Sequence, residues 1–334
     1  MDGTRYLLRE FRETDFDALV TLLNAVEPDD PVSVESLRHF IGSFLPSSRL
    51  HQVLVEDRRS GELVGSAAIF AEPSESDPAK LWIWGVVLPA RQREGIGSQL
   101  YDTLLAEAKE RKATGLRIRV REDSAAGRAF LGKRGFRERR RSWRSRLEVA
   151  PSDTSRLASL VRTLTSDGVE FTTLSREGVT DLHVLHRVHD LDSVAGRDMP
   201  RDGTYRPYSF EQFRRLFLEG ENFLPDAWFL AKVGNQYVGL SSGAREPAQP
   251  KVLQQYFTGI RPEFRRRRIA LALKLMFIDF AKRNGYARIE TWNDSLNLPM
   301  WTLNQGLGFQ KVRETILLNR DLKGAPDQPG TSRH

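Results

Sequence analysis

The stretch from Val87 to Gly97 reads VLPARQREGIG, and it decides the fold because a related stretch returns at a fixed interval. Residues 260–270, which lie 173 positions later, read IRPEFRRRRIA and keep the proline in the same place. A Gly-Phe pair at Gly135 is repeated at Gly308, again 173 positions later. Several landmarks at one offset indicate an internal duplication, so the chain is predicted to hold two copies of one domain.

Composition limits the class of protein. The 334 residues are 40% hydrophobic, and no apolar run approaches the roughly 20 residues that a membrane helix needs. The chain has no cysteine, which excludes disulfides, thiolate metal sites and a cysteine nucleophile, and which fits a reducing compartment. We therefore expect a cytoplasmic globular protein with no membrane partner and no signal peptide.

The net charge of +7 suits an anionic ligand, but much of it lies in two local clusters, 137–146 and 265–268. In the first cluster, arginines alternate at Arg137, Arg139 and Arg141, as on one face of a strand. A solvated sheet face explains this pattern better than a nucleic-acid surface, because only Trp143 adds an aromatic side chain. A nucleic-acid partner is therefore not expected.

The two halves show the same order of predicted elements. In the first half we expect helices from 14, 96–108 and 125–133, and strands at 52–56, 63–70, 81–88, 116–120 and 136–149. In the second half we expect helices at 210–217, 269–281 and 298–306, and strands at 228–233, 237–241, 253–260, 289–292 and 311–318. This order predicts an α/β fold in each half.

The domain boundaries follow from the duplication and from composition. The first domain is predicted over 1–150 and the second over 168–322. Residues 151–167, rich in Ser, Thr and Arg, are interpreted as a linker that includes some helix. The polar, Pro/Gly-rich segment 323–334 is expected to be a disordered tail.

The turn between Pro89 and Gly95 predicts a phosphate site. A strand stops at the proline and a helix begins near the glycine, so free backbone N–H groups converge there and the helix dipole adds positive potential. Glycine at 95 and 97 would let a pyrophosphate approach the backbone, and Arg91 and Arg93 would neutralise its charge. An ordinary strand-to-helix turn is the alternative, which the duplicate at matched spacing disfavours.

Residues Gln92 to Gly97 resemble the Gln/Arg-x-x-Gly-x-Gly/Ala loop of the GNAT superfamily of N-acyltransferases. The resemblance extends over residues 4–147, and 168–320 is similar through its closing Leu-Gly-Phe at Leu307. It implies two GNAT domains, each with a mixed, mainly antiparallel central sheet flanked by helices. It also implies acetyl-CoA as cosubstrate.

The resemblance implies an N-acetyltransferase that moves an acetyl group from acetyl-CoA to a primary amine of a small molecule or a protein. A strand N–H near Val87 would steady the oxyanion. The cofactor-binding residues that it implies are Val87, Arg91, Gln92, Arg93, Glu94, Gly95, Ile96, Gly97 and Ser98.

Two departures from the family pattern concern catalysis in the first domain. Leu131 stands where many members have a tyrosine that protonates the thiolate, and Ser124 stands where asparagine is frequent. The candidate general base is Glu122, although a solvated charge or a helix cap explains it equally well. Glu290 has the same standing in the second domain.

No metal site is predicted. His183, His186 and His189 have helical i, i+3 spacing, which could make a metal face. No carboxylate stands at a matching position, so ordinary helix positions are the favoured interpretation.

The second loop carries Arg268 where the family has glycine. Either this loop is degenerate and no longer binds CoA, or guanidinium contacts to phosphate replace backbone contacts. The first domain is therefore expected to hold the acetyl-CoA. Two other classes of function stay open: a non-catalytic acyl-CoA sensor or scaffold, and a nucleic-acid-associated protein.

Overall fold

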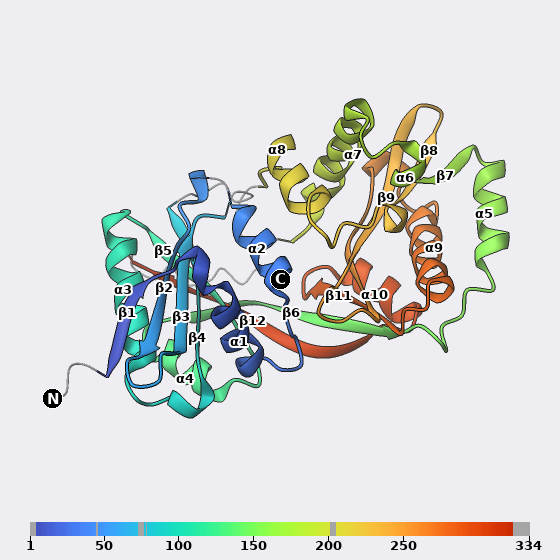
Figure 1. Cartoon of the computed structure of the whole chain (residues 1–334). Helices are drawn as coiled ribbons and strands as arrows, with labels where there is room; N and C mark the ends of the chain where they lie inside the picture. The colour runs from blue at the N-terminus through green and yellow to red at the C-terminus, as the bar shows by residue number, and fades with distance from the viewer. Residues whose placement is uncertain (1–4, 45, 73–76, 78, 201–204, 323–334) are drawn as a thin grey trace, which may run out of the picture. The chain divides into compact units, whose positions relative to one another are not determined.

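A computed structural model describes residues 5–44, 46–72, 77, 79–200 and 205–322 (Figure 1). The chain forms two compact units. The first unit comprises residues 1–26, 46–140 and 315–334, and the second comprises 27–45 and 141–314. Each half is an α/β unit, as the order of elements predicts.

The first unit is built on a mixed sheet with strand order β1-β2-β3-β4-β5-β12. Neighbouring strands are antiparallel except β4 and β5, which are parallel. The predicted fold class, a mainly antiparallel mixed sheet, is thus confirmed for this unit. The strands are β1 (Tyr6–Glu10), β2 (His51–Asp57), β3 (Glu62–Phe70), β4 (Lys80–Val87), β5 (Gly115–Arg121) and the end of β12 (Gln310–Asp321).

Helices cover both faces of this sheet. Helix α3 (Ile96–Glu110) buries Leu100 and Leu104 against Val53 and Val55 of β2. Leu54 lies between those two valines and faces the opposite side of the sheet, where α1 (Phe16–Val26) packs against β3 and β4. Short helices at Glu13–Asp15, Pro46–Ser48 and Pro89–Arg91 and helix α4 (Ala125–Gly132) complete the unit.

The second unit repeats this plan with strand order β6-β11-β10-β9-β8-β7, in which only β10 and β11 are parallel. The strands are the end of β6 (Arg137–Glu148), β7 (Val169–Thr173), β8 (Phe229–Val233), β9 (Gln236–Arg245), β10 (Val252–Ile260) and β11 (Arg288–Asp294).

Two long helices cover the second sheet. Helix α9 (Ile269–Arg283) shares a core with Leu253 and Ile289, and α7 (Leu182–Ala195) shares another with Leu230 and Leu240. The remaining helices are α2 (Val34–Gly42), α5 (Leu157–Ser166), α6 (Leu174–Glu177), α8 (Phe210–Phe213) with a π-helical turn at Arg214–Leu218, α10 (Leu298–Gly306), and short turns at Gly196–Asp198, Pro225–Ala227 and Pro262–Phe264.

Each sheet is completed by a strand from the other half of the sequence. Strand β12 follows the second copy of the duplication, yet its residues 315–321 pair with β5 of the first unit. Strand β6 follows the first copy, yet its residues 142–148 pair with β11 of the second unit. The compact units therefore differ from the predicted ranges 1–150 and 168–322, because these last strands are exchanged.

The segment 27–45 also belongs to the second unit. Asp30 accepts hydrogen bonds from the Arg144 guanidinium on β6, one of them at 2.7 Å, and Arg313 lies 3.2 Å from Glu27. These ion pairs bind the segment to that unit, and no local sequence pattern reveals them.

Within the predicted linker 151–167, residues 157–166 form α5 and pack against α9. Leucines at 157, 160 and 164 have helical spacing and make this contact. The predicted tail 323–334 lies outside the described residues.

Candidate functional site

The two parallel strands of the first unit separate along their length. Strand β4 pairs with β5 only over 80–82 and 115–117, although the two strands continue to Val87 and Arg121. The unpaired part of β4 is five residues long, or roughly 16 Å at the rise of a strand. A gap with backbone hydrogen-bonding groups on its walls therefore opens between the strands.

Every second N–H of β4 faces this gap. The Leu88 N–H donates to the Val64 oxygen of β3 at 2.9 Å. Because N–H groups alternate in direction along a strand, those of Val87 and Gly85 point to the other side, toward β5. Val87 lies at the end of the gap next to the turn, and Gly85 lies further along it.

The turn that follows β4 is built on left-handed backbone conformations at Arg93, with φ of 70°, and Gly95, with φ of 89°. Helix α3 starts at Ile96, and the first N–H groups that bond back are those of Ser98 and Gln99, to the Gly95 oxygen at 3.0 and 3.1 Å. The N–H groups of the first two helical residues thus have no partner within the helix. A helix start of this kind binds anions such as phosphate.

Gly97 lies where the start of α3 approaches α4 and the end of β4. A Cβ atom at this position would lie 3.6 Å from the Phe130 ring of α4 and 3.7 Å from the Val87 side chain. A longer side chain would fill the space between α3, α4 and the end of β4. At Gly95, by contrast, a Cβ would meet nothing within 4 Å, so glycine there serves the backbone conformation.

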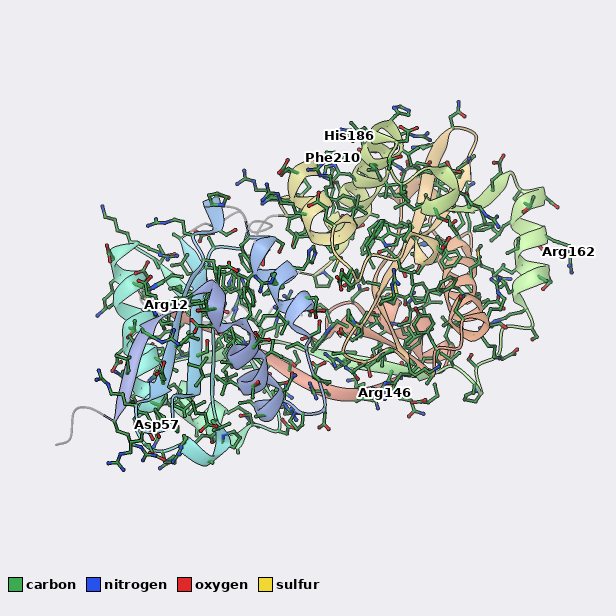
Figure 2. The ribbon with its side chains drawn as sticks, in the orientation of Figure 1. Arg12, Asp57, Arg146, Arg162, His186 and Phe210 are labelled. Atoms are coloured by element: carbon green, nitrogen blue, oxygen red, sulfur yellow. The ribbon has the colours of Figure 1, made fainter. Side chains whose placement is uncertain are left out.

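Ion pairs connect the turn after β4 to the start of the chain and to the end of β2. Asp57 at the end of β2 accepts from Arg5 Nε at 3.1 Å and lies 3.7 Å from the Arg91 guanidinium (Figure 2). Glu94 accepts from Arg5 at 3.1 Å and from the Tyr6 hydroxyl. The Arg59 backbone N–H, followed by Arg5, holds the pKa of Asp57 below its usual value. The side chains of Arg91 and Glu94, both predicted to bind the cofactor, therefore form ion pairs with other residues of the protein.

The other predicted residues of the turn have varied surroundings. The Gln92 amide donates to the Val87 oxygen at 3.3 Å, and the Ser98 hydroxyl accepts from Arg134 at 2.9 Å. Arg93 is exposed. The structure thus brings Val87 and residues 91–98 together at one end of the gap.

Sequence reasoning missed Arg5, Tyr6 and Asp57, which position the turn. The signal that could have found them is Asp57, a carboxylate that directly follows an apolar strand. Arg5 lies 52 positions from Asp57 in the sequence, so this pairing could not be read from local spacing.

The candidate base Glu122 follows β5 directly. Since β4 and β5 are parallel, their carboxyl ends lie at one edge of the sheet, so Glu122 lies at the same end of the gap as the phosphate turn. Ser124 caps α4 by accepting from the Gly127 N–H at 3.3 Å, and Leu131 is buried.

The second unit repeats the turn with different side chains. Arg266 and Arg268 both have φ of 62°, and they stand 173 positions after Arg93 and Gly95. Arg265 Nε donates to the Ile260 oxygen at 3.1 Å, which repeats the contact of Gln92 with Val87. The second turn therefore keeps left-handed conformations at both positions, although arginine stands where the first turn has Gly95.

Strand β10 also leaves its parallel partner part-way. It pairs with β11 over 252–255 and 288–291, and the pairing then ends. At this point β10 carries a bulge at Tyr256 in its pairing with β9. The first unit has no such bulge at the corresponding position, Ile83.

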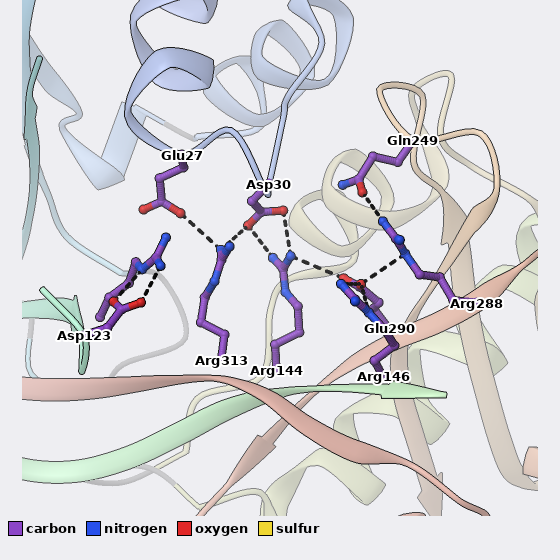
Figure 3. A network of polar contacts seen from close by, with 10 residues as sticks. Glu27, Asp30, Asp123, Arg144, Arg146, Gln249, Arg288, Glu290 and Arg313 are labelled. Atoms are coloured by element: carbon purple, nitrogen blue, oxygen red, sulfur yellow. Dashed lines mark hydrogen bonds and ion pairs between the residues drawn. The ribbon is translucent and has the colours of Figure 1, made fainter. Parts of the chain in front are cut away.

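Glu290 of β11, the second candidate base, lies in a network of ion pairs (Figure 3). Its carboxylate accepts from Arg146 at 2.9 Å and from Arg144 at 3.3 Å, and Arg288 Nε lies 3.4 Å away. Both oxygens are engaged by guanidinium groups and the side chain is buried, which suits a structural charge better than a base.

The three histidines of α7 are not arranged around a common centre. The His186 ring stacks on Phe210, with ring centroids 3.7 Å apart (Figure 2). His189 Nε2 lies 2.8 Å from the backbone oxygen of Tyr208. Among the described residues no group of three or more His, Asp and Glu side chains is placed to hold a metal ion.

The comparisons with known proteins decide the family. The model of the acetyltransferase (GNAT) family matches residues 10–136 and 190–309, one region in each copy of the duplication. The chain belongs to the GNAT acetyltransferase family. It is an acyltransferase with two GNAT regions.

Solved structures share the fold of this GNAT protein over almost its whole length. It is similar to a tandem GNAT protein from the clavulanic acid biosynthesis pathway, with 17% identity, a TM-score of 0.74, and 96% of this chain and 99% of the other covered. A GCN5-related N-acetyltransferase from Sphaerobacter thermophilus gives 19% identity, a TM-score of 0.69, and 97% and 98% coverage. No curated protein matches the sequence.

Within the part of the chain that the structure describes, no helix is both long enough and apolar enough to cross a bilayer.

Proposed function

We propose that the protein transfers an acetyl group from acetyl-CoA to a primary amine of a small molecule or a protein. The observation that carries this proposal is the position of Gly97, between the helix start that follows the turn and the part of β4 that is not paired with β5. A phosphate group would lie on the turn after β4, and a thin arm would run along the gap. A long acyl-CoA has this shape.

The N–H groups of Val87 and Gly85 on β4 would have different roles along the gap. Val87 lies beside the phosphate turn and would hold the arm of the cofactor, whereas the Gly85 N–H, further along, would face the thioester. Donors aimed at the developing oxyanion stabilise the tetrahedral intermediate. The amine nitrogen forms a bond with the carbonyl carbon, the bond from carbon to sulfur breaks, and CoA leaves as the thiol.

Glu122 is the candidate base that we propose for the first unit. It would have to receive the amine proton through water, because it lies at the phosphate end of the gap while the thioester would lie further along. Glu122 can therefore act as the base only if the amine reaches the thioester from the end of the gap where Glu122 lies.

This placement and the buried Leu131 favour a second candidate function for the first unit, the binding of acyl-CoA without turnover. The cytoplasm stays the proposed compartment, and the cysteine-free sequence supports it.

The test is an incubation of the full chain with acetyl-CoA and a panel of primary amines: an alkylamine, L-lysine, spermidine and a short peptide. Release of thiol and an N-acetylated product by mass spectrometry are expected. Gly97→Trp should weaken cofactor binding in the first unit, while Gly132→Trp, where a Cβ meets nothing within 4 Å, should not. Binding of acetyl-CoA without thiol release above background would contradict the transferase and leave a non-catalytic binder.

A further inference from the structure

The second unit has a carboxylate, Glu246, near the start of β10, at the opposite end of that strand from the turn before α9. Glu246 directly follows β9, whose last residue Arg245 pairs with Leu253 near the start of β10. The turn before α9 lies at the other end of β10, after Ile260. Between the end of the pairing with β11 at Gln255 and Ile260 the strand covers roughly 16 Å.

Glu246 differs from the other carboxylates nearby. Asp30 and Glu290 are engaged by the guanidinium of Arg144. Glu246 Oε1 is buried and has no hydrogen-bond partner among the described residues. A buried carboxylate oxygen without a donor is costly, which is expected where a reacting group supplies the missing proton.

Burial and the surrounding charges raise the pKa of the Glu246 carboxyl. Burial raises its pKa, and the charges of Asp30 and Glu290 raise it further. The Ala248 backbone N–H and the Arg144 charge act in the opposite direction without cancelling this shift. A base with a raised pKa accepts a proton more readily near neutral pH.

Tyr256 marks where an acyl group would lie. It is the bulged residue of β10, the first residue beyond the pairing with β11, and its side chain is 42% exposed. Its hydroxyl accepts from Asn222 Nδ2 at 3.0 Å. Burial of this hydroxyl, followed by the charge of Glu246, raises the pKa of Tyr256 to about 12, so the phenol stays protonated near neutral pH.

We propose that the second unit is an acyl-transfer centre of its own, in which Glu246 is the general base. This inference depends on the proposed acetyltransferase function. The phosphates of acetyl-CoA would bind to the turn that holds Arg266 and Arg268 in left-handed conformations, and the thioester would lie near Tyr256. Arginine side chains add charge to a backbone site that is already formed.

The step balances in atoms and charge. The amine nitrogen attacks the thioester carbon, and its proton passes to the Glu246 carboxylate. The bond from carbon to sulfur breaks, the thiolate takes up a proton from water, and Glu246 returns its own proton to solvent.

The experiment uses the full chain with Gly97→Trp, so that only the second unit can act, with acetyl-CoA and the same panel of amines. Glu246→Gln is expected to lower kcat/KM by about 100-fold or more, the usual contribution of a general base. It should also remove the acid limb of the pH profile and leave acetyl-CoA affinity unchanged. Glu221→Gln, an exposed carboxylate in the same unit, is the matched control and should keep full activity.

Two other outcomes distinguish failure of the second acyl-transfer centre from failure of the proposed acetyltransferase function. If Gly97→Trp is folded but inactive, and Glu246→Gln in the wild-type background is fully active, the second centre is disproved while the acetyltransferase function stands. If the wild type itself releases no thiol with any amine, the proposed function fails and this inference fails with it. Melting temperatures of all variants guard against loss of fold.

Discussion

Arg268 holds a left-handed conformation that costs a residue with a Cβ roughly 1–2 kcal/mol. Its counterpart Gly95 holds the same conformation without that cost. The second turn has therefore kept a backbone that its side chains disfavour. The surrounding fold imposes this geometry, because the short helix before the turn and the helix after it are the same in both units.

We predict that Arg268→Gly stabilises the protein by about 1 kcal/mol relative to Arg267→Gly. The neighbouring arginine is the control because its φ is not positive. Chemical denaturation of the two variants measures the difference. Equal stabilities would show that the turn relaxes at position 268 and that its geometry is not imposed.

Lys274 is a second residue in an unfavourable environment, because its ionisable amine is buried. It lies 2% exposed on α9, and its ammonium donates to Gln255 Oε1 at 2.5 Å. Burial lowers its pKa to about 7. The unfolded chain, with a lysine pKa of about 10.4, binds more protons between these two values.

The contribution of Lys274 to the free energy of unfolding should therefore rise between pH 7 and 9, by up to about 1.4 kcal/mol per pH unit. Lys274→Met should flatten this rise and increase the free energy of unfolding at pH 7. Denaturation of wild type and variant at several pH values gives the comparison, with the exposed Lys133→Met as control. Parallel pH profiles for wild type and Lys274→Met would exclude a buried neutral lysine.

At the scale of elements, helix caps recur with the duplication. Ser124 accepts from the Gly127 N–H at the start of α4, and Asn297 accepts from the Met300 N–H at the start of α10, both at 3.3 Å. The two residues stand 173 positions apart. At these positions the cap explains the residue types without any role in catalysis.

The exchanged strands make the two halves depend on one another. Thr315 to Asp321 of β12 cover the edge of β5, and without them that edge would present unpaired N–H and C=O groups. We predict that removal of residues 315–334 abolishes the cooperative melting of the first unit and causes aggregation. Removal of 323–334, which leaves β12 intact, is the control and should melt like the wild type.

Circular dichroism and light scattering during heating measure both effects. A chain without 315–334 that melts cooperatively as a monomer would show that β5 needs no exchanged strand.

For the whole molecule, the sequence predicted the α/β class, the duplication and the GNAT fold, because glycine, proline and apolar periodicity are local signals. The turn at 91–97 was predicted for the same reason. The strand exchange could not be predicted, since β6 has the same pattern whether it pairs with β5 or β11. Nor could the surroundings of Glu246, which bring together residues from 30 to 290 in the chain.

The central claim is that each unit binds acetyl-CoA through its turn, and calorimetric titration tests it most directly. Gly97 and Ala270 occupy matched positions in the two copies, so Gly97→Trp and Ala270→Trp each place a bulky side chain in the first turn of α3 or of α9. We predict two acetyl-CoA molecules per chain for the wild type and one for either variant. Unchanged stoichiometry in Gly97→Trp, or no binding to the wild type, would contradict the account.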